Sequence, residues 1–229
     1  MTRREELAAN VAALEQRIEA ACTAAGRDRG EVTLVAVTKT WPVDDIALLR
    51  DLGLHDFGEN RDQEAAPKAA ALPDVRWHFV GAVQTNKARS VASYADVVHS
   101  VDRLGLVRAL SAGAVRADRV VDALVQVSLD GAEGRGGALP ADVPAVADAV
   151  AAAPGLRLAG VMAVAPLGAD PAPAFARLAQ VAAVLRDTHP DARTISAGMS
   201  ADLESAVAAG ANALRVGTAL LGHRGGRTR

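Results

Sequence analysis

The chain contains 229 residues, half of them hydrophobic, and its formal net charge is −2 at pH 7. This length suits one barrel or two small domains. Charges of both signs are interspersed along the chain, a pattern that indicates neither a nucleic-acid partner nor an anionic membrane surface. Aromatic residues make up only 3% of the chain, so Ala, Val and Leu are expected to build the core.

The N-terminal sequence MTRREELAAN lacks the apolar stretch of a signal peptide, and no run of about 20 apolar residues predicts a membrane span. The single cysteine, Cys22, falls in a predicted helix, where we interpret it as a small buried residue rather than a nucleophile. These features predict a protein of the reducing cytoplasm. The basic segment 223–229 is interpreted as a solvated tail.

A helix is predicted first, over residues 3–25, because apolar residues recur there every three or four positions and Gly26 is placed to end it. A short apolar run followed by a longer Ala- and Leu-rich stretch then repeats along the chain. The predicted strands cover residues 31–38, 55–59, 76–81, 95–101, 122–129, 156–164, 192–198 and 212–219. The predicted helices between them cover residues 43–53, 60–72, 85–93, 103–117, 140–153, 172–188 and 200–209.

Strands that alternate with helices predict a parallel sheet, and eight such units in about 200–250 residues are the size of a (β/α)8 barrel. A doubly wound open sheet is the alternative fold. That fold is typical of chains with fewer strands and a phosphate-binding loop after the first, but neither GxGxxG nor GxxxxGK[ST] occurs. The glycine-rich segment 131–137 has neither spacing, and no Pro- or Ser-rich linker divides the chain. We therefore expect one α/β barrel over residues 1–229.

Barrels of this type place their active sites at the C-terminal ends of the strands and commonly bind phosphate after strands 7 and 8. Both of those loops carry glycine and hydroxyl groups here, namely Gly198 and Ser200 in the first and Gly217 and Thr218 in the second. Ser200 is also placed to cap the helix predicted to begin there. The alternative is that Ser200 serves only as a helix cap and Gly217 only as a turn residue. The presence of both loops at the two expected strand ends favours a phosphate site.

Two basic residues stand at predicted strand ends. Arg215 lies in the otherwise apolar ALRVGTAL, and the two-residue alternation of a strand turns it into the barrel. A guanidinium there needs an acceptor, which is either a carboxylate in a structural ion pair or a ligand. Lys39 ends the first strand, where an amine close to another cation forms imines more readily. A lysine that only reaches solvent from a strand end is the commoner role.

The histidines are less informative. His78 and His99 lie in predicted strands, where either could face the mouth of the barrel, whereas His55, His189 and His223 are interpreted as loop or surface residues. No pair of His, Asp or Glu has convincing metal-ligand spacing. A Ser-His-Asp constellation cannot be assembled from the sequence either.

Six segments of the chain are distinctive: AVTKTWPVDDI, FGENRDQE, WHFVGAVQTNKAR, VHSVDR, GVMAV and SAGMSADLESAVAAGANALRVGTALLG. Together they resemble the YggS/PROSC family, the pyridoxal phosphate homeostasis proteins, from about residue 31 to residue 222. The resemblance implies a barrel similar to the N-terminal barrel of alanine racemase. It also implies pyridoxal 5′-phosphate (PLP) as the cofactor and a role in PLP homeostasis, without a committed reaction.

The resemblance further implies which residues hold the cofactor. Lys39 would carry PLP as a Schiff base, an internal aldimine, and Arg215 would face the pyridine nitrogen. Because arginine is a permanent cation, it would keep that nitrogen unprotonated and weaken PLP as an electron sink. The other implied cofactor-binding residues are Gly198, Met199, Ser200, Gly217 and Thr218 around the phosphate, Asn60 close to the cofactor, and His78 and Met162 in the pocket wall.

Two positions depart from the family pattern. The loop after the fifth strand carries Arg135 near the position of a family lysine, so a role of residues 131–137 in phosphate or partner contact is open. The acidic pair that usually follows GMS is reduced to Ala201-Asp202. Neither departure touches Lys39 or Arg215.

Two alternative functions stand beside PLP homeostasis: a small PLP-dependent amino-acid racemase and a phosphate-binding barrel enzyme that does not use PLP. Racemisation needs a base on each face of the cofactor. The one tyrosine, Tyr94, is predicted at the N-terminal end of the barrel, and the chain looks like the barrel alone, without the second domain through which alanine racemases dimerise. We therefore expect a monomer with no catalytic residue. Its expected partners are PLP and the apo-enzymes that receive PLP from it.

Overall fold

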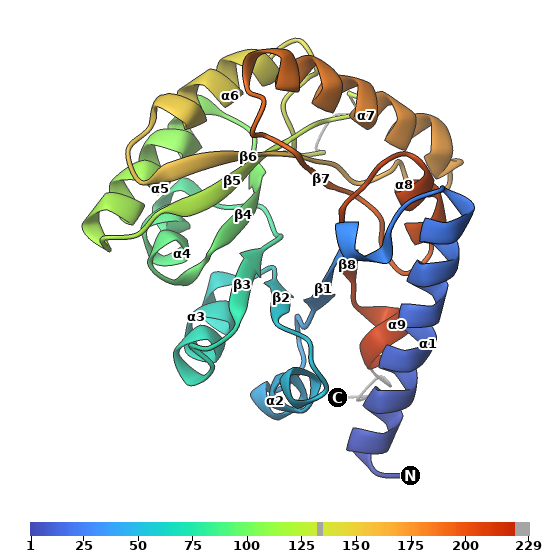
Figure 1. The fold of residues 1–229 in the computed structure, drawn as a ribbon. Helices are drawn as coiled ribbons and strands as arrows, with labels where there is room; N and C mark the ends of the chain where they lie inside the picture. Colours follow the sequence, from blue (N-terminus) through green and yellow to red (C-terminus); the bar gives the residue numbers. More distant parts are fainter. Residues whose placement is uncertain (132–134, 223–229) are drawn as a thin grey trace.

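Eight parallel strands close into a barrel in the computed structural model, which describes residues 1–131 and 135–222 (Figure 1). The strands are β1 (Thr33–Val37), β2 (Asp56–Glu59), β3 (Arg76–Phe79), β4 (Val97–Val101), β5 (Val121–Gln126), β6 (Leu156–Met162), β7 (Thr194–Ser196) and β8 (Ala213–Val216). They follow one another in chain order, and β8 pairs with β1 to complete the ring. The expected (β/α)8 barrel is confirmed, and an open doubly wound sheet is excluded by that closing pair.

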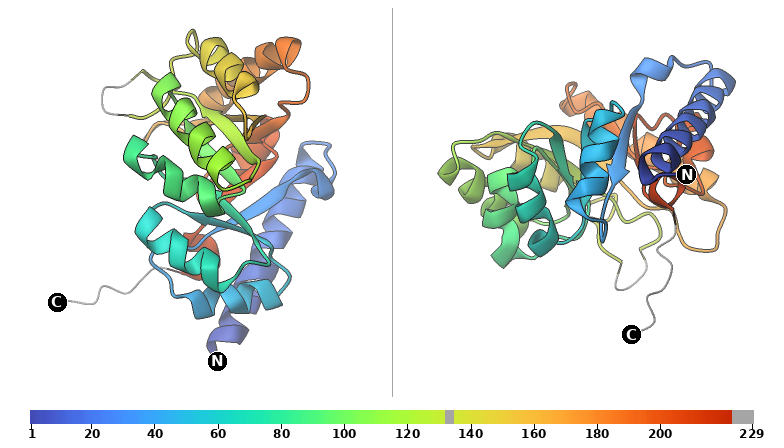
Figure 2. Two further views of the ribbon diagram at one scale, coloured as in Figure 1. Left: turned by 90° about the vertical axis from the view of Figure 1, so that its left-hand side faces the viewer. Right: turned by 90° about the horizontal axis from the view of Figure 1, so that it is seen from below.

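Helices surround the barrel, and the ring of strands lies inside them (Figure 2). They are α1 (Arg3–Ala24), α2 (Val43–Asp51), α3 (Asp62–Ala71), α4 (Ala88–Tyr94), α5 (Leu104–Arg116), α6 (Val143–Ala152), α7 (Pro171–Thr188), α8 (Leu203–Ala208) and α9 (Thr218–Leu221), with short 3-10 helices η1 (Arg29–Glu31) and η2 (Thr85–Lys87). The extra N-terminal helix α1 begins at a capping box formed by Thr2 and Glu5. It ends just before Gly26, whose φ of +66° suits glycine.

Several predicted bounds are corrected near the barrel's last two strands. Strand β7 spans three residues instead of 192–198. Strand β8 ends at Val216, and residues 218 and 219, expected at the end of that strand, instead begin α9. Helix α8 begins at Leu203 rather than at residue 200, because the Asp202 carboxylate accepts the Met199 N–H at 2.6 Å and holds the intervening residues in a turn. The predicted helix 85–93 is divided into η2 and α4.

The main core lies between the outer face of the strands and the surrounding helices, and Ala, Val and Leu dominate it as expected. Cys22 is fully buried in this core, which confirms its predicted place. A second, smaller cluster of Val97, Leu124 and Met162 is separate from the first. None of the described helices is both long and apolar enough to cross a bilayer. The predicted tail 223–229 lies outside the described residues.

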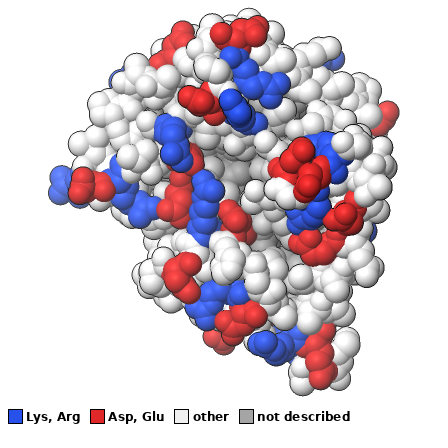
Figure 3. Space-filling model, viewed as in Figure 1, with Lys and Arg blue, Asp and Glu red and all other residues white. Residues whose placement is uncertain are grey.

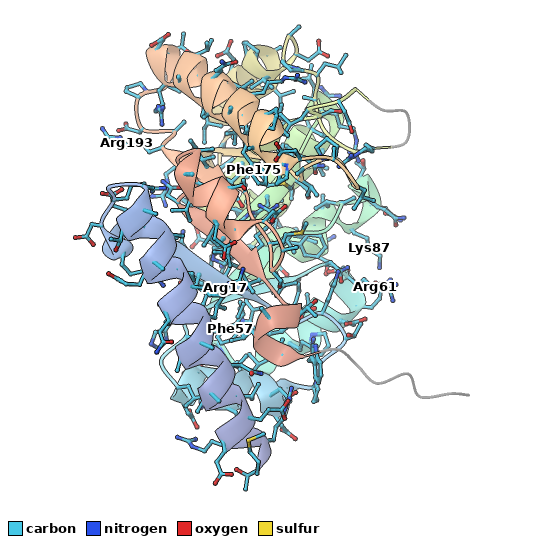
Figure 4. All side chains as sticks on the ribbon, turned by 90° about the vertical axis from the view of Figure 1, so that its right-hand side faces the viewer. Arg17, Phe57, Arg61, Lys87, Phe175 and Arg193 are labelled. Atoms are coloured by element: carbon cyan, nitrogen blue, oxygen red, sulfur yellow. The ribbon has the colours of Figure 1, made fainter. Side chains whose placement is uncertain are left out.

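The two ends of the barrel can be told apart by the residues that stand at the strand ends. Figure 4 shows Arg61 and Lys87, which follow β2 and β3, on one side of the molecule and Arg193, which precedes β7, on the other. The first side is the C-terminal end of the barrel and the second is the N-terminal end. Figures 1 and 3 view the N-terminal end, where charged side chains of both signs gather around a central hollow. Barrels of this type carry their active sites at the opposite, C-terminal end.

Candidate functional site

Lys39 lies at the C-terminal end of the barrel, two residues beyond the end of β1, and it is exposed. Its neighbours are fixed to α3 on both sides: the Thr38 carbonyl accepts from Lys68 Nζ at 3.0 Å, and the Thr40 N–H donates to Glu64 Oε2 at 2.8 Å. Thr40 has a φ of +69°, a left-handed conformation that β-branched residues rarely adopt. Strain of this kind is typical of functional turns that the surroundings hold in place.

A buried ion pair supports this turn from behind the strands. Lys68 Nζ lies 2.6 Å from Glu59 Oε1, which also accepts the Thr38 hydroxyl at 2.7 Å. Burial raises the pKa of Glu59, and the bonds from Lys68 and Thr38 oppose that rise. The other carboxylate oxygen, Oε2, has no hydrogen-bond partner among the described residues. This pair was not predicted from the sequence, although a glutamate at the end of a strand predicted to be buried signals a nearby cation.

Arg215 is buried, with 5% of its surface exposed. Its Nη1 donates to Ser196 Oγ at 2.5 Å, and its Nη2 donates to the Ala163 carbonyl at 2.8 Å. Both acceptors are neutral, and no carboxylate of the described residues forms an ion pair with this guanidinium, so the structural ion-pair alternative is not supported. Burial lowers the pKa of Arg215 to about 10, which leaves it protonated at neutral pH. A buried cation with only neutral partners suits a ligand that supplies an acceptor.

A line of buried side chains extends from Ser196 away from Arg215. Ser196 Oγ lies 2.9 Å from His99 Nδ1, and His99 Nε2 lies 2.9 Å from His78 Nδ1. His78 Nε2 in turn lies 2.8 Å from Asp56 Oδ1. Burial, together with His78, Arg215 and Arg76, holds the pKa of His99 well below its usual value, so His99 is neutral at pH 7.

Both ring nitrogens of His78 are therefore engaged, and it reaches Arg215 only through His99 and Ser196. A contact between His78 and a cofactor stays a prediction. No role for Ser196 was predicted from the sequence, and His99 was predicted only as a residue that could face the mouth of the barrel. Their signal was the two-residue alternation, which turns a histidine and a serine of the apolar strands into the barrel.

The two glycine-containing loops after β7 and β8 are joined to each other. Ser200 Oγ accepts the Ala219 N–H at 3.1 Å, so it caps the first turn of α9. The sequence had predicted that Ser200 would cap a helix beginning at residue 200, and that prediction is wrong. Gly198 has a φ of +89°, and a Cβ there would lie 2.7 Å from the Ala206 Cβ. A Cβ on Gly217 would lie 3.1 Å from the Val37 carbonyl oxygen at the end of β1. Both glycines therefore let backbone approach closely at this end of the barrel.

The remaining predicted phosphate residues differ in their surroundings. Thr218 is exposed as the first residue of α9, whereas the Met199 N–H is already bonded to Asp202. Helix α1 holds this region in place, because Arg17 donates to the Ser200 carbonyl at 3.2 Å and pairs with Glu204 at 2.7 Å (Figure 4). The extra N-terminal helix α1 thus packs outside the loop after β7 and stabilises it.

Asn60 and Met162 lie at the ends of their strands. Asn60 follows β2 and lines a groove of about 250 Å³ together with Gln84 and Lys87. Gly81 lets the backbone after β3 lie close to the backbone of Asn60, since a Cβ there would lie 2.3 Å from the Asn60 carbonyl oxygen. Met162 ends β6, 2% exposed, and pairs in register with Ser196, which bonds Arg215. The contact of each residue with a cofactor stays a prediction.

Two residues that the sequence analysis set apart lie away from these groups. Arg135 forms an ion pair with Asp130 at 2.7 Å and donates to the Ala165 carbonyl at 3.0 Å, so it joins the loops after β5 and β6. Tyr94 ends α4, and its hydroxyl lies 3.4 Å from Asp62 Oδ1 on α3, in the outer layer of helices. Residues 132–134 lie outside the described part of the chain.

Metal binding finds no support in residues 1–131 and 135–222, since no group of three or more His, Cys, Asp or Glu side chains is arranged to hold an ion. The site is instead an amine, a buried guanidinium and two loops rich in hydroxyl and N–H groups. These groups suit an anionic ligand that also carries a group reactive toward amines.

Comparisons with known proteins agree with this chemistry. The family model described as alanine racemase, N-terminal domain, matches residues 9–225. The pyridoxal phosphate homeostasis protein of Pseudomonas aeruginosa is 42% identical over 220 residues, which cover 95% of this chain and 96% of that protein. The structure of PipY from Synechococcus elongatus, solved with PLP bound, is 34% identical, with a TM-score of 0.82 over 94% of this chain and 100% of PipY.

A more distant likeness concerns the fold alone. Alanine racemase from Corynebacterium glutamicum is 15% identical, with a TM-score of 0.69. The match covers 99% of this chain but 62% of the racemase chain. The barrel is thus shared, and the racemase has a further part that this chain does not match.

Proposed function

The chain belongs to the family of the pyridoxal phosphate homeostasis proteins, and on this premise we propose that it binds PLP with Lys39 as the attachment residue. One observation carries the proposal: neighbouring strand ends present an exposed lysine, a buried guanidinium that forms no ion pair within residues 1–131 and 135–222, and two loops of glycine and hydroxyl residues. Strands β1 and β8 pair directly, with Val35 opposite Arg215, so Lys39 and Arg215 leave adjacent strands. The PLP seen in PipY is consistent with this assignment.

Each group has a role that its chemistry suits. PLP supplies an aldehyde that condenses with a primary amine with loss of water, and Lys39 offers that amine. Ser200 and Thr218 offer hydroxyl hydrogens to the phosphate, because the Ser200 oxygen already accepts from Ala219 and its hydrogen is left to donate. Gly198 and Gly217 keep the space beside them clear.

Arg215 would donate a hydrogen bond to the pyridine nitrogen. A guanidinium has no acceptor, so the nitrogen facing it stays unprotonated. An unprotonated ring withdraws electrons from an attached amino acid less strongly. This arrangement suits a protein that holds PLP, or a racemase, better than a transaminase, and we propose the role without a committed reaction.

The proposed cellular role is to hold PLP and release it to apo-enzymes in the cytoplasm. The name of the Pseudomonas aeruginosa relative, with 42% identity, supports a homeostasis role. A racemase is the alternative, and no described tyrosine favours it, since Tyr94 is bonded to Asp62 between α3 and α4. The recipients would be enzymes that lack bound PLP.

A visible absorption spectrum tests the proposal. Wild-type protein with added PLP should show the band of a lysine imine, and Lys39→Ala should lose it while retaining weak binding through the phosphate loops. Lys87→Ala is the matched control, because Lys87 is a partly exposed lysine at the same end of the barrel. After borohydride reduction, peptide mass spectrometry should find the adduct on Lys39. An adduct on Lys87 or Lys68, or no band in the wild type, would overturn the assignment.

A further inference from the structure

We propose that Ser196, His99, His78 and Asp56 form a one-directional hydrogen-bond relay that positions Arg215 from the far side of the barrel. The relay makes Ser196 an obligate acceptor for the guanidinium and ends on the Asp56 carboxylate. His99 and His78 are positioning residues here, because they act on Arg215 through Ser196 and would not themselves contact the ligand atoms that Arg215 binds. The functional part of the inference rests on PLP binding, whereas the direction of the relay does not.

The direction follows from the serine hydroxyl. Ser196 Oγ has two partners among the described residues, Arg215 Nη1 at 2.5 Å and His99 Nδ1 at 2.9 Å. A guanidinium only donates, so the serine proton has one acceptor, His99 Nδ1. That nitrogen must therefore carry no hydrogen.

The next two steps follow in turn. A neutral imidazole with a bare Nδ1 carries its hydrogen on Nε2, and His99 Nε2 lies 2.9 Å from His78 Nδ1. His78 Nδ1 then accepts, so the hydrogen of His78 is on Nε2, 2.8 Å from Asp56 Oδ1. Each histidine has the same tautomer, and each donor meets one acceptor. The carboxylate, which only accepts, closes the line.

The reverse direction fails on this geometry. It would place a hydrogen on His99 Nδ1, pointing at Ser196, which already receives a hydrogen from Arg215. The serine proton would then have no acceptor within the described residues, in a site where Ser196 and His99 are at most 1% exposed. An unsatisfied buried hydroxyl is costly, and the forward direction avoids it.

The relay opens toward the N-terminal end of the barrel. His78 and His99 line a cavity of about 140 Å³ there, with Arg76, Asp122 and Glu31 around it. Asp56 is the first residue of β2 and is partly exposed, so the carboxylate is solvated. The anchor of the relay is therefore accessible from the end opposite Lys39, and the relay couples Arg215 to a carboxylate at that end.

The consequence for Arg215 is a fixed orientation. One Nη donates to Ser196 and the other to the Ala163 carbonyl, and neither acceptor can turn away without breaking a buried bond. The remaining guanidinium hydrogens are left for a ligand. Loss of the relay would let Ser196 rotate and would loosen the guanidinium.

Imidazole ¹⁵N NMR of the protein without PLP tests the direction. His78 and His99, assigned through His78→Gln and His99→Gln, should both show a bare Nδ1 and a protonated Nε2 at pH 7. A protonated Nδ1 on either ring overturns the relay. Because this measurement uses no PLP, its result is independent of whether the proposed function is correct.

Matched carboxylate variants test the positioning. Asp56→Ala removes the acceptor that ends the relay, and Asp148→Ala removes a carboxylate that also bonds a histidine Nε2, that of His189 at 2.8 Å, on the protein surface. Asp56→Ala should weaken PLP binding about fivefold and shift the absorption maximum, whereas Asp148→Ala should do neither. Equal behaviour of the two variants would refute positioning.

Ser196 variants provide a second route if Asp56→Ala folds poorly. Ser196→Ala should weaken PLP binding about tenfold, since a charged donor loses its acceptor. Ser196→Thr keeps the hydroxyl and should recover most of the affinity and the wild-type spectrum. Failure of the threonine variant to recover either, in a folded protein, would mean that Ser196 acts only through packing. No PLP binding by the wild type would defeat the proposed function and leave the NMR result standing.

Discussion

The Ser200 hydroxyl accepts the backbone N–H of Ala219 at 3.1 Å, and this bond joins the loop after β7 to the start of α9. The two residues are 19 positions apart in the chain, yet their loops form one surface at the C-terminal end of the barrel. Because the Ser200 hydroxyl of one loop bonds the first turn of α9 after the other loop, it fixes the relative position of the two loops that would contact a phosphate.

Replacing Ser200 should therefore weaken PLP binding. Ser200→Ala removes a hydroxyl donor to the phosphate and the acceptor of Ala219, and we expect a loss of about 1.5–3 kcal/mol in binding free energy. Fluorescence or absorption titration with PLP measures it. Ser205→Ala in α8 is the control and should bind normally; a similar loss in both variants would point to general loosening of α8.

Arg215 should contribute to PLP binding through both its charge and its planar guanidinium group. Arg215→Ala should lower PLP affinity by about 1.5–3 kcal/mol and shift the imine absorption, because the pyridine nitrogen loses its donor. Arg215→Lys retains the charge without the planar fork and should lie in between. Arg157→Ala, at the N-terminal start of β6, is the control for removing a strand arginine. Unchanged affinity and spectrum in a folded Arg215→Ala protein would make Arg215 purely structural.

The buried pair of Lys68 and Glu59 should be essential for stability. Lys68→Met leaves the Glu59 carboxylate buried without its cation, and we expect the free energy of unfolding to fall by about 3–5 kcal/mol. The double variant Lys68→Met with Glu59→Gln should recover part of this loss, because no charge is left buried. Urea denaturation measures both. A single variant as stable as the wild type would mean that water solvates Glu59 in solution.

His99 should make the fold sensitive to acid. Its pKa in the folded protein lies well below the ordinary 6.5, so the unfolded chain binds a proton there that the folded chain does not. The free energy of unfolding therefore falls as pH drops below about 6.5, by up to about 1.4 kcal/mol per pH unit from this group.

Denaturation at pH 7.5, 6.5 and 5.5 measures that slope. The variant His99→Gln should be less stable overall, with a weaker dependence on pH across this range. The control His55→Gln replaces an exposed histidine and should keep the wild-type slope. Equal slopes in the wild type and His99→Gln would show that His99 titrates normally.

The protein should not racemise amino acids efficiently. Tyr94 lies in the outer layer of helices, bonded to Asp62, where it cannot serve as a second base at the mouth of the barrel. Incubation of the PLP-loaded protein with L-alanine in deuterated water should give little α-deuteration and little D-alanine. Rapid deuteration with inversion, lost in Lys39→Ala, would make the protein a racemase.

The sequence by itself determined the order of strands and helices and the residues that stand at strand ends. Apolar periodicity and chain order are local properties, so the barrel, Lys39 and Arg215 could be placed without coordinates. The same alternation indicated that Arg215 faces inward, and its bond to Ser196 Oγ, which His99 also contacts, agrees with that orientation, whereas Leu214 and Val216 lie in the main core. The cofactor contacts of these residues remain predictions.

Only the tertiary structure decided which partners these residues have. Ser200 was expected to cap its own helix, but closure of the barrel brings Ala219 to it and a local turn through Asp202 delays α8. The relay from Arg215 to Asp56 joins side chains from five strands, and Glu59 meets Lys68 across a strand and a helix. Such bonds depend on which elements pack together, and periodicity along one chain segment carries no information about a partner on another.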